Sequence, residues 1–92
     1  MVTASELKRK QKIYEDRRIE TFKKVFKVVE KKIIKRSEAD HYYTWYKVPE
    51  YLLNVPIYDV DRCKEYIINQ LRDNEFEVDE YEDNKLLIKW MN

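Results

Sequence analysis

Residues 76–90 read FEVDEYEDNKLLIKW, and this stretch decides the fold because a single strand register keeps its apolar side chains together. Alternate residues of a strand point to opposite faces of a sheet. Pairing Val78 with Ile88 places both side chains on one face of an antiparallel hairpin. Continuing that ladder sets Phe76 opposite Trp90 on the same face. A slip of one residue would set these apolar side chains opposite charged ones, so the sequence predicts a β-hairpin in this register.

Asparagines are expected at the two turns next to the hairpin strands. The register leaves residues 82–84 as a three-residue loop with Asn84 in the left-handed conformation. Just upstream, Asn74 is expected to end a helix in the left-handed conformation usually given to glycine. Either Asp59 or Asp61 caps the start of that helix. Its apolar side chains form one stripe with two neighbours: Val60, Cys63, Tyr66, Ile67, Ile68 and Leu71.

A tyrosine-rich strand is predicted at residues 41–48, which end before Pro49. One face would carry Tyr42, Thr44, Tyr46 and Val48, and the other Tyr43, Trp45 and Lys47. Residues 49–58 contain both prolines and are expected to be a connector, with one short turn near residues 50–53.

A long helix is predicted at the N-terminus. Thr3 and Glu6 form a capping box, in which the Thr3 hydroxyl accepts from an early N–H and Glu6 reaches back to the cap. No proline or glycine follows before Ser37, so one helix of about 30 residues is permitted. Its second half carries a core-forming stripe of Phe22, Val25, Phe26, Val29 and Ile33. The first half is apolar only at scattered positions and is expected to project from the domain or to fray.

The sequence therefore predicts an α+β fold with the order helix, strand, connector, helix, strand, strand. A three-stranded antiparallel sheet ending in the hairpin would pack against the second helix and the C-terminal half of the first. Residues 1–20 would form a basic helical extension, and residues 21–92 a single α+β domain. The order is winged-helix-like, but the expected recognition helix and wing are predominantly acidic, which argues against that mode of DNA binding.

Composition excludes several classes of protein. The chain has no glycine, so glycine-based phosphate loops, the dinucleotide fingerprint and the nucleophile elbow are absent. One cysteine excludes an intramolecular disulfide and a cysteine zinc cluster, and fits a reducing compartment. No apolar run is long enough for a membrane span, and the first residues do not resemble a signal peptide. We expect a soluble, intracellular protein that does not bind membranes.

No constellation of residues indicates catalysis. His41, the only histidine, has no partner at metal-ligand spacing, and Cys63 lies on an apolar stripe where a thiol is usually a small buried hydrophobe. The carboxylates of residues 75–83 lack the spacing of a calcium loop and fit a solvated acidic face. We expect no enzyme, no catalytic residue, no bound metal and no cofactor.

Charge asymmetry identifies the main candidate for binding. Residues 1–36 hold 13 basic and 5 acidic side chains, a net of +8, whereas residues 37–92 carry a net of −7. The candidate partner-binding residues are Leu7, Lys8, Arg9, Lys10, Lys12, Ile13, Tyr14, Arg17 and Arg18. We expect this helix, helped by the tyrosine-rich strand, to bind a protein partner or a second copy. The alternatives are a nucleic-acid-binding accessory or packaging protein, whose lysines and arginines neutralise phosphates, and a helix exterior that is only solvated.

The C-terminal half also resembles a known family. The matching residues are Tyr46-Lys47-Val48-Pro49-Glu50-Tyr51, Pro56-Ile57-Tyr58-Asp59, Cys63-Lys64-Glu65-Tyr66-Ile67-Ile68, and Leu71, Asn74, Phe76, Val78, Asn84, Leu86, Ile88 and Trp90. Across residues 43–90 the chain is similar to short, functionally uncharacterised proteins of nucleo-cytoplasmic large DNA viruses. The resemblance implies a virion or virus-factory role, located in the host cytoplasm or the virion, and implies no activity.

Overall fold

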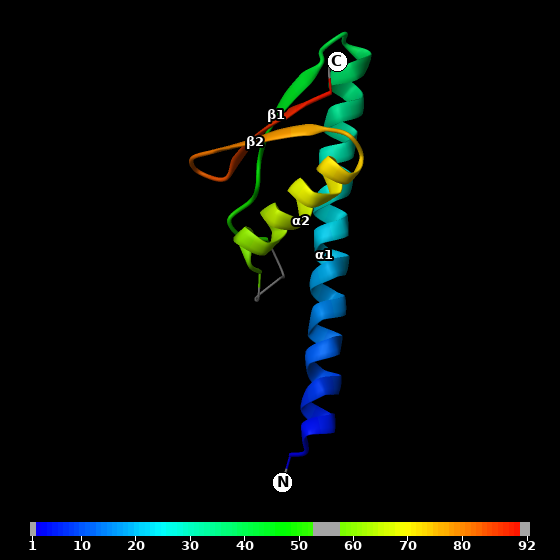
Figure 1. Cartoon of the computed structure of the whole chain (residues 1–92), viewed down its shortest axis with the longest axis vertical. Coiled ribbons are helices and arrows are strands. Elements are labelled where there is room, and N and C mark those ends of the chain that lie inside the picture. The colour runs from blue at the N-terminus through cyan, green and yellow to red at the C-terminus, as the bar shows by residue number, and fades with distance from the viewer. Residues whose placement is uncertain (1, 53–57, 91–92) are drawn as a thin grey trace.

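The computed structural model describes residues 2–52 and 58–90 of the chain. Its elements are α1 (Ala4–Glu38), β1 (Tyr43–Lys47), α2 (Val60–Asp73), β2 (Glu77–Tyr81) and β3 (Lys85–Lys89). The molecule measures 60 × 24 × 22 Å because α1 runs its whole length, with α2 and the sheet beside only the C-terminal half of that helix (Figure 1). The predicted α+β class and element order are confirmed.

The sheet has three antiparallel strands with β3 in the centre, in the order β1-β3-β2. Val78 pairs with Ile88 across β2 and β3, which confirms the predicted register. On the other side of β3, Thr44 of β1 also pairs with Ile88. Beyond the strand ends, the Phe76 and Trp90 rings meet edge to face with centroids 6.2 Å apart. The apolar alternation of residues 76–90 therefore determined the hairpin as expected.

α1 begins at the predicted cap, where the Thr3 hydroxyl accepts from the Glu6 N–H at 3.3 Å. The helix has 35 residues and spans about 52 Å at 1.5 Å per residue. Its buried side chains are Phe22, Val25, Val29 and Ile33, four of the five residues of the predicted stripe, while Phe26 is half-buried at its edge. Only the second half of α1 therefore belongs to the core.

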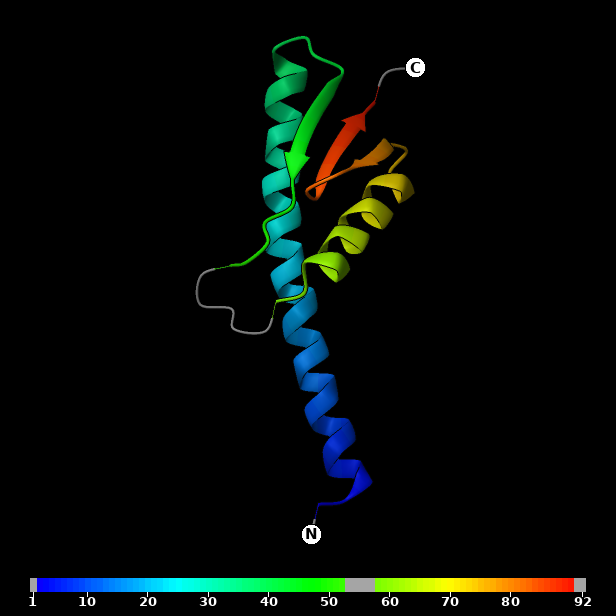
Figure 2. The same ribbon diagram turned by 90° about the vertical axis from the view of Figure 1, so that its left-hand side faces the viewer.

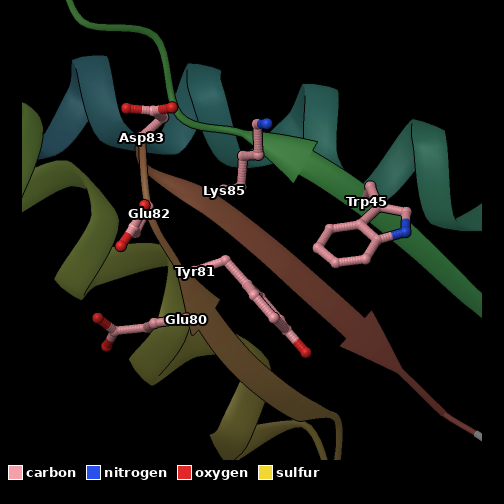
Figure 3. A pocket seen from close by; sticks show the side chains of 6 residues that line it. All are labelled: Trp45, Glu80, Tyr81, Glu82, Asp83 and Lys85. Atoms are coloured by element: carbon pink, nitrogen blue, oxygen red, sulfur yellow. The ribbon is translucent and has the colours of Figure 1, made fainter.

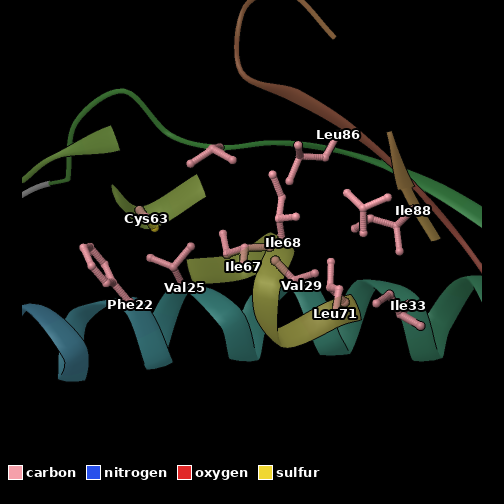
Figure 4. Close-up of a cluster of buried hydrophobic side chains, with 12 residues drawn as sticks. Phe22, Val25, Val29, Ile33, Cys63, Ile67, Ile68, Leu71, Leu86 and Ile88 are labelled. Atoms are coloured by element: carbon pink, nitrogen blue, oxygen red, sulfur yellow. The ribbon is translucent and has the colours of Figure 1, made fainter. Parts of the chain in front are cut away.

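The core lies between α1, α2 and the inner face of the sheet (Figure 4). Side chains from all three elements point toward one another there, and those of α2 are Cys63, Ile67, Ile68 and Leu71. Val78, Leu86 and Ile88 supply the sheet's apolar contribution. Cys63 is fully buried, which confirms its predicted place on the apolar stripe of α2.

Asp59 is the N-cap of α2, since its carboxylate accepts from the N–H groups of Asp61 and Arg62. The predicted left-handed Asn74 is wrong. Asn74 has φ −104°, and Glu75 after it takes the left-handed conformation with φ 71°. The helix ends at Asp73 with Asn74 as its cap, within the expected range, and a Schellman pair of hydrogen bonds closes it, from Glu75 N to the Arg72 oxygen and from Phe76 N to the Leu71 oxygen.

The predictions for the hairpin loop, the first strand and the connector have different outcomes. Asn84 is left-handed as expected, with φ 58°, but Asp83 before it is left-handed too, with φ 60°. The strand predicted at residues 41–48 is shorter in the structure, where β1 is Tyr43–Lys47. Tyr42 precedes it and is 55% exposed. The turn predicted near residues 50–53 includes residue 53, which lies outside the described residues.

Candidate interaction surfaces

The N-terminal half of α1 projects from the domain, as the sequence predicted. Between residues 4 and 20 no side chain is buried, and Arg18 alone is half-buried. Leu7 is 51% exposed, and Ile13 and Tyr14 are each 50% exposed. Figure 1 shows this half, in blue, continuing beyond α2 and the sheet without touching either. Half of the longest element of the fold is therefore a free helical surface.

The predicted partner-binding residues do not share one side of this helix. Leu7 and Tyr14 are two turns apart, and Val25 follows three turns later, so Leu7 and Tyr14 prolong the stripe that packs into the core. Ile13 precedes Tyr14 and therefore lies about 100° away around the axis. Consecutive basic residues are likewise spread around the helix: Lys8, Arg9, Lys10, Lys12, Arg17 and Arg18. The free half thus has two exposed apolar side chains, Leu7 and Tyr14, on the side of the core stripe, together with Gln11 and Arg18, and basic side chains around its circumference.

Positive charge is densest on the packed half of α1. The candidate binding residues predicted from the sequence lie on the other half. Residues 1–20 carry six basic and four acidic side chains, whereas residues 21–36 carry seven basic and one acidic. Five of these seven form an exposed lysine face opposite the core stripe: Lys23, Lys24, Lys27, Lys31 and Lys35. The four-residue spacing from Lys23 to Lys35 could have identified this face, because residues four apart are neighbours on a helix.

The other two basic residues of that half contact tyrosines of β1. The Lys32 ammonium lies 5.9 Å from the centre of the Tyr46 ring, and the Arg36 guanidinium lies 5.8 Å from that of Tyr43. Such distances are typical of cation–π contacts. These two residues therefore help to hold β1 against α1, while the lysine face stays open to solvent.

An aromatic pair lies on the outward face of the sheet, beside the hairpin loop (Figure 3). The rings of Trp45 and Tyr81 are 5.0 Å apart between centroids at an interplanar angle of 62°, and the residues are 44% and 50% exposed. They line an open hollow of about 790 Å³ together with Glu80, Glu82, Asp83 and Lys85. In Figure 3 Glu80 points away from the rings, and its carboxylate pairs with Lys64 at 4.0 Å. We call this place the Trp45–Tyr81 hollow.

Further along the outward face, acidic and basic side chains neutralise one another. The Lys89 ammonium lies 2.9 Å from an Asp79 carboxylate oxygen and 3.9 Å from a Glu77 oxygen. The hydrogen bond and the charge of Asp79 raise the pKa of Lys89 above its ordinary value. This part of the sheet is therefore a solvated ion cluster, as the sequence predicted for its carboxylates.

Titratable groups in the core are held in their neutral forms. Burial raises the pKa of the Cys63 thiol, and burial together with the neighbouring Cys63 raises that of the Tyr58 phenol. Burial also raises the pKa of Tyr46. A protonated thiol is a poor nucleophile, so Cys63 is placed for packing. His41 is half-buried and lies edge-on to Tyr43, with ring centroids 6.3 Å apart.

The described residues contain no cluster of three or more histidine, cysteine or acidic side chains that could hold a metal ion. Within the same residues, neither helix combines the length and the apolar character required to cross a membrane.

Comparison with known proteins adds a family and no activity. The model of a family described as "Family of unknown function (DUF5759)" matches residues 2–72, which include α1, β1 and α2 except its last residue. No curated protein and no solved structure matches the chain. The matched range includes the whole free half of α1, so that projecting helix is part of what the family model describes.

Proposed function

The chain belongs to this family of unknown function, and we propose that it is a small non-enzymatic interaction protein that binds another protein, or a second copy of itself, through the N-terminal half of α1. The observation that carries the proposal is the exposed free half of α1, on which Leu7 and Tyr14 lie on the same side of the helix as the core stripe, interrupted there by Gln11 and Arg18. These exposed apolar side chains are available for contact with a partner.

Helix energetics support a partner for this half. Isolated helices shorter than about 12 to 15 residues are marginal in water, and the free half, residues 4–20, is only slightly longer. The described ion pairs include none within α1 that would stabilise it. Leu7 is already half covered, so burying the rest of it against a partner would contribute about half of the roughly 1.5 to 3 kcal/mol that full burial of a leucine gives, and covering Tyr14 would add to it.

The test compares two variants that differ in which side of α1 they alter. Leu7→Asp/Tyr14→Asp places charge on the stripe, and Ile13→Asp places it about 100° away as the matched control. Sedimentation equilibrium measures self-association, and hydrogen exchange of residues 4–20 measures whether the helix is held. We expect the stripe variant to weaken association and speed exchange more than the control does. A wild-type monomer whose residues 4–20 exchange as slowly as the core would contradict the proposal.

Nucleic acid is the second candidate partner, and the lysine face favours it. Like charges four residues apart destabilise a helix by about 0.2 to 0.5 kcal/mol per pair, and a polyanion laid along α1 would relieve that cost. Alanine at Lys27, Lys31 and Lys35 should lower the salt slope of duplex DNA binding by up to about 0.9 per lost phosphate contact. Alanine at Lys8, Arg9, Lys10 and Lys12 is the comparison. An equal slope for both variants and wild type would remove this candidate.

The resemblance of residues 43–90 to short proteins of large DNA viruses supports placing the interaction in virion or virus-factory assembly. A tagged chain that remains with purified virions through a high-salt wash would support that placement. A chain removed completely by the wash would contradict the virion role and leave only the virus-factory role, which absence of the tagged chain from isolated factories would contradict.

A further inference from the structure

The Trp45–Tyr81 hollow exposes two large aromatic rings that a lone domain has no need to leave in solvent. Each ring contacts the other, yet each residue keeps about half of its surface exposed. Tryptophan and tyrosine are the side chains most enriched at the centres of protein interfaces. The pair therefore marks a place where something binds, and the surrounding groups indicate its chemistry.

The lining of the hollow is net acidic, which favours a cation. Glu82 and Asp83 lie on the hairpin loop at one end of the hollow, and Lys85, the one basic residue of the lining, lies between Asp83 and Trp45 (Figure 3). Aromatic ring faces attract cations, tryptophan most strongly. A phosphate backbone stacking its bases on the same rings would be disfavoured by the net negative charge of the lining. A lysine ammonium or arginine guanidinium fits both the rings and the charge.

The molecule already makes contacts between basic side chains and aromatic rings where α1 packs against β1. Arg36 and Lys32 of α1 sit over Tyr43 and Tyr46 of β1. Trp45 lies between those tyrosines on β1, and no cation occupies its ring face among the described residues. Basic side chains of α1 and aromatic side chains of β1 therefore already contact one another within a single molecule.

The free half of α1 supplies such cations, but not within one molecule. Lys8, Arg9, Lys10 and Lys12 place four basic residues within five positions. In Figure 2 this half points away from the sheet, and α1 is continuous from Ala4 to Glu38, so it does not turn back onto its own hairpin. Only another molecule can bring a basic helix to the Trp45–Tyr81 hollow.

We propose that the Trp45–Tyr81 hollow binds a lysine or arginine from the free half of α1 of a second copy, so that the basic helix of one molecule docks on the acidic, aromatic edge of the next. The inference rests on the proposed function and names its partner as this same chain. The opposite net charges of residues 1–36 and 37–92 then meet between molecules, where they attract.

A charge exchange tests whether these two surfaces meet. One variant changes the helix, Lys8→Glu/Arg9→Glu/Lys12→Glu, and another changes the loop, Glu82→Lys/Asp83→Asn, with asparagine chosen because it tolerates the left-handed backbone at Asp83. We expect each to raise the dissociation constant of self-association, measured by sedimentation equilibrium, about tenfold, as the loss of a strong interface contact does. Both changes in one chain should recover most of that loss, because the exchanged charges attract again.

Aromatic variants test the rings. Trp45→Ala should raise the dissociation constant about tenfold. The control is Tyr51→Ala, which removes another exposed aromatic side chain, 78% exposed, away from the hollow. Circular dichroism and urea unfolding of every variant check that the fold is intact.

The following results would contradict this inference, and each shows which part of it fails. If helix variants weaken association while loop and Trp45 variants do not, the helix binds elsewhere, and the proposed function stands without the hollow. Losses that add without recovery in the combined chain show that the two surfaces do not meet. A chain that stays monomeric, or a single-stranded oligonucleotide that quenches tryptophan fluorescence in wild type but not in Trp45→Ala, refutes the second copy as occupant.

Discussion

Replacing Glu75 by glycine should stabilise the protein, because Glu75 is held in a conformation that suits glycine. Its φ of 71° places Cβ against the backbone, and the two Schellman hydrogen bonds prevent it from relaxing. The left-handed conformation costs a non-glycine residue about 1 to 2 kcal/mol. Glycine costs about 0.5 to 1 kcal/mol more backbone entropy on folding. The difference leaves about 0.5 to 1 kcal/mol of stabilisation.

Removing the negative charge of Glu75 should also stabilise the protein. The Glu75 carboxylate is exposed next to the C-terminal end of α2, where the helix dipole disfavours negative charge by about 0.3 to 1 kcal/mol at low ionic strength. Glu75→Ala removes the charge and keeps Cβ, so it should recover only this smaller part, and high salt should abolish that gain. The gain of Glu75→Gly over Glu75→Ala should persist in salt, because it comes from the backbone.

Urea unfolding monitored by circular dichroism gives the free energies, and each kcal/mol should move the melting temperature by about 4 to 8 °C for a domain of this size. Asn74→Gly is the matched control. Asn74 has an ordinary negative φ, and its side-chain amide donates to the Gln70 carbonyl at 2.7 Å, so glycine there should destabilise by about 1 kcal/mol. Stabilisation by Asn74→Gly with none from Glu75→Gly would refute this account of the helix end.

Three further outcomes are expected from the core. Leu71→Ala should cost about 2 to 5 kcal/mol in urea unfolding, because Leu71 is 1% exposed between α1 and α2, and a cost under 1 kcal/mol would contradict that placement. Trp90→Ala should cost less than the roughly 3 to 5 kcal/mol of a fully buried tryptophan, because Trp90 is only half-buried against Phe76, and a variant as stable as wild type would show that the hairpin register is wrong. The Cys63 thiol should react slowly with a thiol reagent in native protein and quickly in urea. Because folding raises the pKa of this thiol, its contribution to the free energy of unfolding is complete below the ordinary thiol pKa of 9.0 and declines as the pH rises above it. Between pH 9 and 10 the free energy of unfolding should therefore fall less for Cys63→Ala than for wild type. Equal native and unfolded reaction rates would refute the burial of this thiol.

Local pattern was enough to predict the elements of this fold. The Thr3 cap and the α1 stripe depend on residues three and four apart, and the pairing of Val78 with Ile88 follows from the two-residue period of a strand. The free half of α1 was predictable too, because a helix without a full apolar face cannot be held by a core. These features are short-range, so neighbouring residues contain all the information they need.

Tertiary structure alone decided which exposed residues stand together. Trp45 and Tyr81 are 36 positions apart, and they meet only because β3 lies between β1 and β2 and brings both outward faces into one plane. The lysine face of α1 was visible as spacing, but its exposure depended on which side of the helix the core occupied. The left-handed residue at the end of α2 is Glu75 and not Asn74, and hydrogen bonds from the Glu75 and Phe76 N–H groups close the helix there. The meeting of Trp45 and Tyr81 depends on contacts between distant segments, which propensity and periodicity do not contain.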